Sequence, residues 1–380
     1  MTDTGPQRQH YRVTFAVLSV GALSYSLLQS LIIPAIPDIQ ASLHASATAV
    51  SWLLTAFLLT ASVATPIVGR LGDMYGKERA LLVVLIILAV GTFISAIASS
   101  IELMIAGRAI QGIAGGVFPL SFAIIRDEFP RERVAGGMGL ISSILGIGGG
   151  LGLVLAGPIT EQLSYHWLYW LPLVAVIIAA IATHLFVPES PVKSEGHVNW
   201  LAAALLSVGL GVVLVAISQT STWGWGSAKT LGLLAFGVLT LATWVTVELR
   251  ADEPLIDMKM MRIKGVWTTN LVGFLVGVGM YASFLLIPEF VQEPTSTGYG
   301  FGAAVTASGL FLLPATFMQV AVGQLSGRLE HRFGSKLLAI AGAGFCATAF
   351  VLLAVARSAE WEVYVASALL GTGIGLALSS

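Results

Sequence analysis

Apolar runs of about 20 residues recur along the whole chain, and only short polar segments separate them. A helix of that length is about 30 Å long, which matches the hydrocarbon core of a lipid bilayer. In that core every backbone N–H and C=O group must be paired within the protein, so that only helices and closed barrels can span it. The sequence therefore predicts an all-α integral membrane protein with many spans.

Turn and charge signals between the runs predict twelve spans in groups of six, two and four. The first six lie near 13–33, 48–69, 80–99, 102–125, 135–159 and 166–187. The next two lie near 199–218 and 228–249, and the last four near 265–289, 303–325, 337–356 and 361–380. A polar segment with two prolines, 188–197, follows the sixth span and marks a boundary, because proline breaks helices.

Composition excludes several classes of function. Only 10% of the residues are charged, whereas about 25% are charged in a typical soluble domain. The net charge is −1, and there is no clustered basic surface of the kind that nucleic-acid binding needs. The single cysteine, Cys346, and the scattered histidines form no metal-ligand pattern. We therefore expect no nucleic acid, no metal, no cofactor and no catalytic residues.

Lysine and arginine are distributed unevenly between the two sides of the membrane. If the N-terminus is cytoplasmic, sixteen of the 19 basic residues lie in cytoplasmic segments. Arg108 lies within a span, and only Lys229 and Arg357 fall on the other side. Because cytoplasmic loops carry an excess of Lys and Arg, this bias predicts a multi-pass protein of the plasma (inner) membrane with its N-terminus inside.

A polar segment rich in glycine, residues 69–79, separates the second and third spans, and we call it the island. Its three glycines, Gly69, Gly72 and Gly76, permit a tight reversal and close helix approach. Asp73 can face the positive end of a helix, and the basic residues can pair with acids on neighbouring loops. An ordinary positively charged loop explains the same composition.

A weaker copy of the island occurs in the second half of the chain. Residues 327–329 repeat the Gly-Arg-Leu sequence of residues 69–71, and Gly334 matches Gly76. The repeat predicts two homologous halves. They form an N-terminal six-helix bundle, a linker with an inserted helix pair, and a partial C-terminal bundle of four helices, over 1–187, 188–264 and 265–380. A complete second half needs six helices, so we expect the chain to end two helices early.

The island resembles the signature of the major facilitator superfamily, Gly-x-x-x-Asp-x-x-Gly-[Arg/Lys]-x-[Arg/Lys]. Its defined positions are filled by Gly69, Asp73, Gly76, Lys77 and Arg79. The resemblance implies a two-bundle fold in which this loop is part of the cytoplasmic gate. In the weaker copy His331 replaces the acid, so a single strong gate copy is expected.

The six-two-six plan, Trp52 at the start of the second span, and Trp223 with Trp225 resemble the fourteen-helix drug:proton antiporter branch. That resemblance implies export of hydrophobic or amphipathic small organic molecules by proton antiport and alternating access. The partners would be a small-molecule substrate, protons and the lipid bilayer, and we expect a monomer. Two alternatives stay open: a uniporter or importer of another small metabolite that is not proton-coupled, and a membrane scaffold or sensor that transports nothing.

Arg108 lies deep in the fourth span, with Gln111 one turn later. An intramembrane arginine is energetically unfavourable unless it faces a cavity or a partner, so it is a functional candidate. The segment resembles the superfamily's Arg-x-x-Gln-Gly motif, which implies a role in coupling or substrate contact. A structural arginine bonded to backbone carbonyls and Gln111 is the alternative. Gly112 and Gly116, four residues apart, indicate close helix packing.

The fifth span is rich in glycine and ends with Gly157 and Pro158. This resembles the Gly-Pro motif of antiporters in the superfamily, although the match is loose, and a glycine-rich packing face is the alternative. The first span departs from the antiporter pattern, because Leu28 occupies the position of the usual proton-carrying acid. Gln29 and Asn270 are expected to be buried polar residues that line the substrate pathway or bond between helices.

Three acids near the outer helix ends could replace the missing carboxylate: Asp38, Glu161 and Glu289. Carboxylates at a membrane interface are more often simply solvated, which is the alternative for all three.

Overall fold

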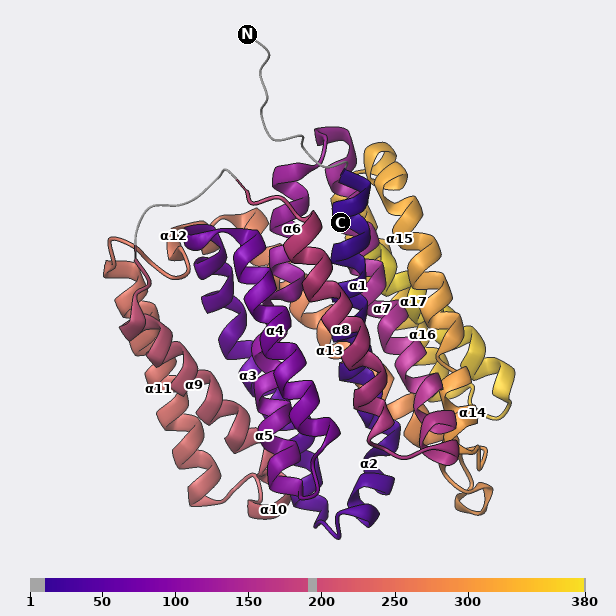
Figure 1. Ribbon diagram of the computed structural model, residues 1–380. Helices are drawn as coiled ribbons and strands as arrows, with labels where there is room; N and C mark the ends of the chain where they lie inside the picture. Colours follow the sequence, from indigo (N-terminus) through magenta and orange to yellow (C-terminus); the bar gives the residue numbers. More distant parts are fainter. Residues whose placement is uncertain (1–10, 191–196, 379–380) are drawn as a thin grey trace. The chain divides into compact units, whose positions relative to one another are not determined.

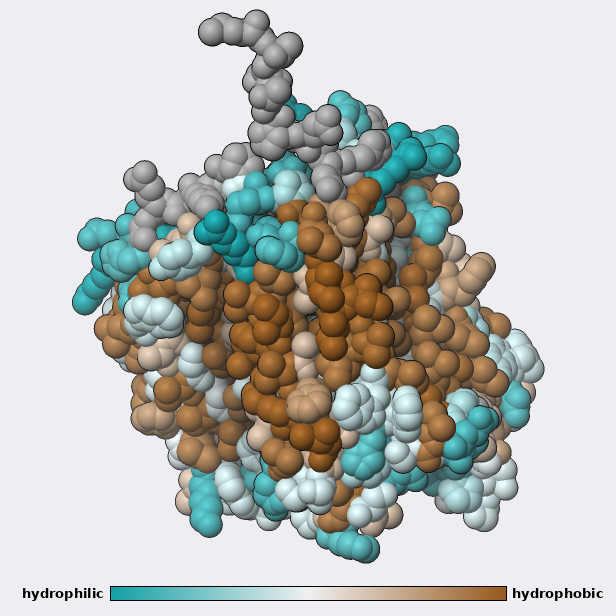
Figure 2. Space-filling model, viewed as in Figure 1, coloured by the Kyte–Doolittle hydropathy of each residue, from teal (hydrophilic) through white to brown (hydrophobic). Residues whose placement is uncertain are grey.

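The computed structural model describes residues 11–190 and 197–378 and is helical throughout, with no strand in that part of the chain. Twelve helices in those residues are long and apolar enough to span a membrane, as the apolar runs predict. Figure 2 shows hydrophobic residues over the middle of the helices and hydrophilic residues toward their ends. Residues 191–196 of the predicted linker lie outside the described residues.

The first six spans are divided into more helical segments than the sequence predicts. They comprise α1 (Tyr11–Ser30) with α2 (Ile32–Ser42), α3 (Ala47–Tyr75), α4 (Lys77–Ala96), α5 (Ile101–Gly112) with α6 (Val117–Glu128), α7 (Arg131–Gln162) and α8 (Trp167–Phe186). The short 3-10 segment η1 (Ile113–Gly116) joins α5 to α6. Two further spans, α9 (Trp200–Ser218) and α11 (Ala228–Arg250), are joined through α10 (Thr220–Trp223).

The remaining chain begins with the short helix α12 (Met258–Met261). It continues through α13 (Lys264–Gln292), η2 (Thr295–Thr297), α14 (Val305–Leu310), α15 (Leu313–Phe333), α16 (Ser335–Val355) and α17 (Glu360–Leu378). Polar residues begin several helices: the side chains of Ser46, Ser100 and Asn199 accept hydrogen bonds from backbone N–H groups in the first turns of α3, α5 and α9. Such caps satisfy N–H groups that have no partner within the helix.

The helices form two compact units that do not follow chain order. The first unit contains 40–128 and 173–266, with the start of α1. The second contains 18–39, 129–172 and the chain from Trp267 onward, so that most of α1 and all of α7 group with C-terminal helices. The division into 1–187, 188–264 and 265–380 therefore stays a prediction.

In the first unit, α9 and α11 lie side by side, and α9 also contacts α3 (Figure 1). Helices α4 and α5 approach closely where Gly91 meets Gly107. A Cβ atom on Gly91 would lie 2.8 Å from the carbonyl oxygen of Gly107. A Cβ atom on Gly112 would likewise collide with Phe57 of α3, and a Cβ atom on Gly116 would collide with Val68 of α3. The close packing predicted for Gly112 and Gly116 is confirmed.

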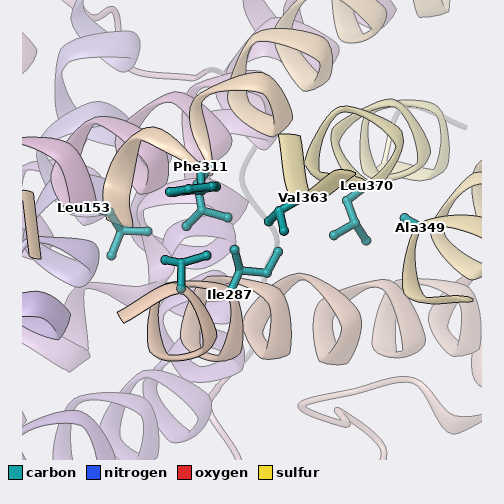
Figure 3. Close-up of a cluster of buried hydrophobic side chains, with 8 residues drawn as sticks. Leu153, Ile287, Phe311, Ala349, Val363 and Leu370 are labelled. Atoms are coloured by element: carbon teal, nitrogen blue, oxygen red, sulfur yellow. The ribbon is translucent and has the colours of Figure 1, made fainter. Parts of the chain in front are cut away.

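A hydrophobic cluster joins the helices of the second unit. Figure 3 shows Leu153 of α7, Ile287 of α13 and Phe311, which follows α14, pointing toward one another. The cluster continues to Val363 and Leu370 of α17. Aromatic rings extend it, since Phe311 stacks on Tyr364 with ring centroids 4.5 Å apart. Van der Waals packing of this kind holds helices together in a membrane, where lipid is as apolar as the side chains.

Candidate functional site

The island is helical except at one residue. Helix α3 continues to Tyr75 and α4 begins at Lys77, so that Gly76 alone makes the reversal. The sequence predicts spans that end near 69 and restart near 80, because the charged residues between them are unsuited to lipid. Those residues instead extend both helices, since a helix can continue beyond the hydrocarbon core into the polar interface.

Gly76 occupies a backbone conformation that other residues rarely adopt, with φ 116° and ψ 137°. A Cβ atom there would also collide with the carboxylate of Glu189. Gly72 is pressed against Leu120 of α6, whereas a Cβ on Gly69 would meet no atom within 4 Å. The predicted reversal and close approach are confirmed at Gly76 and Gly72, and Gly69 has neither role.

Lys77 is the buried centre of the island, with only 2% of its side chain exposed. Its ammonium group bonds to the carboxylate of Asp127, at the end of α6. Asp127 also accepts a hydrogen bond of 2.7 Å from the hydroxyl of Ser190. On the preceding turn, the Oδ1 atom of Asp73 lies 3.9 Å from the Lys77 Nζ atom, and the Asp73 side chain is 45% exposed. The buried Lys77–Asp127 pair therefore joins α3, α4, α6 and the segment after α8.

Two arginines of the island pair with acids from later segments. Arg79 is largely exposed, and its Nε atom lies 3.4 Å from Glu189 Oε2. Arg70 lies 3.7 Å from Glu253, which precedes α12. Glu253 also accepts a hydrogen bond from the backbone N–H of His197. The prediction that basic residues of the island pair with acids on neighbouring segments is confirmed, although pattern reasoning does not single out Asp127, Glu189 or Glu253.

The second copy of the island lies at the junction of α15 and α16, where Gly334 has φ 78° and caps α15. Its position matches that of Gly76 between α3 and α4, as the repeat predicts. The His331 side chain lies outside the described ones.

Arg108 is completely buried and bonded on several sides. Its Nε atom donates to the carbonyl oxygen of Leu53 (3.0 Å), and Nη1 donates to Gln111 Oε1 (2.7 Å). The guanidinium carbon lies 4.3 Å from the centroid of the Phe57 ring, a cation–π contact. Gln111 in turn donates to the hydroxyl of Ser95 (3.3 Å). This geometry matches the structural alternative, and a coupling or substrate role stays a prediction.

Gln29 lines a cavity of about 20 Å³ between α1, α7 and α13, within the second unit. Such a volume accommodates about one water molecule. Ser26 and Ser30 lie beside it and donate to the carbonyl oxygens of Leu145 and Gly148, which attaches α1 to α7. Leu28 is buried in the packing of this unit.

Asn270 of α13 is exposed, so the burial expected from its place in an apolar run is wrong. Periodicity in a span does not reveal which face meets a neighbour, because lipid-facing and packed residues are equally apolar. A role for Asn270 in the substrate pathway stays a prediction.

The glycines of α7 pack against three different helices. Gly148 and Gly152 face Ser26 and Ser30 of α1, Gly146 and Gly150 face α15, and Gly149 faces Phe284 of α13. Further along, Gly157 is buried and the helix continues through Pro158. The glycine-rich packing face is therefore present, and the antiporter role of Gly157 and Pro158 stays a prediction.

The acids considered as replacement proton carriers are exposed at helix ends: Asp38, Glu161 and Glu289. Glu289 borders a groove of about 430 Å³ between α2 and the end of α13. These positions match the solvated alternative.

Comparisons with known proteins agree with this architecture. A family model described as Major Facilitator Superfamily matches residues 18–380. An uncharacterized MFS-type transporter of Mycobacterium tuberculosis is 28% identical over 373 residues, which cover 96% of this chain and 53% of the relative. Multidrug transporter protein MdtP of Bacillus subtilis is 27% identical over 364 residues, covering 94% of this chain and 66% of MdtP. The chain thus spans about half to two thirds of the length of these relatives.

A solved structure has the same fold. The crystal structure of the human organic anion transporter MFSD10 (TETRAN) matches with a TM-score of 0.59 and 16% sequence identity, covering 99% of this chain and 90% of that one. At that identity the likeness shows the fold alone.

Proposed function

Because the chain belongs to the Major Facilitator Superfamily, a superfamily of transporters and not of enzymes, we propose that it is a secondary transporter that exports hydrophobic or amphipathic small organic molecules. Transport would proceed by alternating access, in which two helix bundles rock around a central substrate site. The name of MdtP, a multidrug transporter, supports a drug-like substrate class.

The observation that carries this proposal is the bonded arrangement of the island. A scaffold or sensor has no need of a buried Lys77–Asp127 pair that joins four segments at one membrane surface, nor of a glycine at φ 116° to make the reversal. A gate has that need, because its closed state must be held by contacts that can be broken and remade. Asp73 is the exposed acid of the signature, so it is available for contacts that change during transport.

Proton antiport is the proposed energy source, and it is the part that the described residues support least. The antiporter resemblance of α7 and the multidrug relatives favour it. Against it stand Leu28, which is buried at the usual acid position, and the exposure of the three outer acids. This specific observation favours the second candidate function, a uniporter or importer without proton coupling.

The fourteen-helix plan is also part of the proposal. Helices α9 and α11 pack on each other, and α9 contacts α3, as an added pair on a six-helix bundle would. On this plan two more helices complete the second half, the protein is a monomer, and both termini are cytoplasmic.

Transport in everted membrane vesicles that carry the full-length protein tests the proposed function. Energised vesicles should accumulate a hydrophobic fluorescent substrate, and collapse of the proton gradient should abolish the accumulation. Accumulation that survives this collapse would exclude proton coupling. Equilibration without accumulation would favour the uniporter.

A further inference from the structure

A long apolar groove lies on the first unit, apart from the bonded residues around Arg108. It has a volume of about 640 Å³, and its walls come from α3, α4, η1 and α9. Leu59, Val63, Ile67 and Leu71 of α3 form one wall, and Val83 and Ile87 of α4 form another. Ser207 closes the groove from α9.

One end of the groove is polar. Tyr75 and Arg79, at the end of α3 and the start of α4, border it at the membrane surface that holds the island. From Tyr75 the groove follows α3 back to Leu59, a helical distance of about 24 Å at 1.5 Å per residue. One leaflet of a bilayer with its headgroups is about 20 Å thick. The groove therefore has the length and the polarity of a single lipid leaflet.

The positive charge of Arg79 at the polar end favours an anionic lipid headgroup. Arg79 is 71% exposed, and its contact with Glu189 is made by the Nε atom. An arginine has five N–H donors in a planar fork that suits a phosphate oxygen pair. Tyr75 is exposed beside it, and a tyrosine at the headgroup level is typical of membrane interfaces.

We propose that this groove binds a phospholipid of the leaflet on the island side, with an acyl chain between α3, α4 and α9 and an anionic headgroup at Arg79. The predicted orientation makes this the cytoplasmic leaflet. A lipid in this position lies against the helices that flank the island and provides a route by which membrane composition acts on it. The binding itself depends only on the groove and its charge, so it can hold even if the proposed substrate class is wrong.

Photocrosslinking in nanodiscs tests the site directly. Full-length protein is placed in discs of phosphatidylcholine with a small fraction of phosphatidylglycerol that carries a photoreactive acyl chain. Crosslinked peptides are then mapped by mass spectrometry. We expect label to concentrate on 59–87, and the same chain on a phosphatidylcholine headgroup to label this region less.

Two matched pairs of variants complete the test. Ser207→Trp fills the groove and should abolish the label on 59–87, whereas Val208→Trp, on an exposed neighbour outside the lining, should leave it unchanged. Arg79→Gln should lower the phosphatidylglycerol label about fivefold, the effect of one interfacial basic residue on an anionic headgroup. Arg126→Gln, an exposed arginine outside the groove, should not.

Three results would overturn the proposal. The first is label spread evenly over lipid-facing helices, which indicates ordinary solvation by lipid. The second is label that persists in Ser207→Trp, and the third is an unchanged headgroup preference in Arg79→Gln. Size-exclusion profiles show whether each variant is folded, and Arg79→Gln keeps the test valid if Ser207→Trp is not.

Discussion

The ammonium group of Lys77 bonds to the carboxylate of Asp127, and this contact joins the first turn of α4 to the last turn of α6. Both side chains are nearly inaccessible to solvent. A buried charge that loses its partner is strongly destabilising, by about 3 to 5 kcal/mol, because its desolvation is no longer compensated.

Asp127→Asn should therefore lower the free energy of unfolding by about 3 kcal/mol. Thermal unfolding of the purified protein, followed with a fluorescent dye that does not react with thiols, measures this decrease in stability. Arg126→Gln is the control, since the Arg126 side chain is 66% exposed and its Nε atom lies 3.9 Å from Asp127 Oδ1, and a partner so exposed contributes less than about 1 kcal/mol. Equal melting temperatures for Asp127→Asn and the control would show that the Lys77–Asp127 contact does not hold the helices together.

Substitution by alanine should affect stability differently at two glycines of the island. Gly76→Ala should destabilise the protein by about 1 to 3 kcal/mol, because alanine is strained at φ 116° and its Cβ meets Glu189. Gly69→Ala should be neutral or stabilising by up to about 1 kcal/mol, since alanine favours the helix and no atom is nearby. Thermal unfolding separates the two variants, and a similar loss in both would refute the distinction.

The variant Arg108→Lys distinguishes a structural role of Arg108 from a role in coupling or substrate contact. Arg108→Lys keeps the charge but loses the fork that reaches both the Leu53 carbonyl and Gln111. We expect a fall of about 2 kcal/mol or more in unfolding free energy from the buried groups left without bonds. If Arg108 also acts in the pathway, transport per folded molecule should fall as well. Unchanged transport per molecule would assign Arg108 to the fold alone.

The predicted orientation can be checked with single cysteines. In a Cys346→Ala background, cysteines at Arg131 and Trp225 should react with a membrane-impermeant maleimide from opposite faces of the membrane. Arg131 begins α7, and Trp225 lies in the loop between α10 and α11. Labelling from the same face would contradict the three spans, α7, α8 and α9, that lie between these positions.

The sequence predicts the spans well and their interruptions poorly. Twelve apolar runs are sufficient to locate twelve helices, because an apolar segment of about 20 residues in hydrocarbon pairs its own backbone N–H and C=O groups by forming a helix. The extension of α3 to Tyr75 is missed, since charge marks the edge of lipid and not the end of a helix. The 3-10 segment at 113–116 is missed as well, because glycines such as Gly112 and Gly116 indicate close packing without revealing a local change in helix geometry.

The sequence predicts the island itself but not the residues that bind to it. The island is recognisable from its glycines and charges, but its partners Asp127 and Glu189 lie far away in sequence and belong to no motif. Arg108 and Gln111 are predicted to interact because they lie one helical turn apart, whereas Phe57 comes from another helix and carries no sequence signal. The exposure of Asn270 could not be predicted, since a polar residue in an apolar run can face either a neighbouring helix or the surface.

Transport by Asp73→Asn, measured in everted vesicles and divided by the amount of folded protein in the membrane, tests the gate most directly. Asp73 is partly exposed and lies 3.9 Å from Lys77, so the substitution should leave folding and abundance close to wild type. If the island is the gate, transport per molecule should fall at least about tenfold, the effect of losing about 1.4 kcal/mol from one conformational state. Transport per molecule equal to that of the wild type would contradict the assignment of the island as the gate.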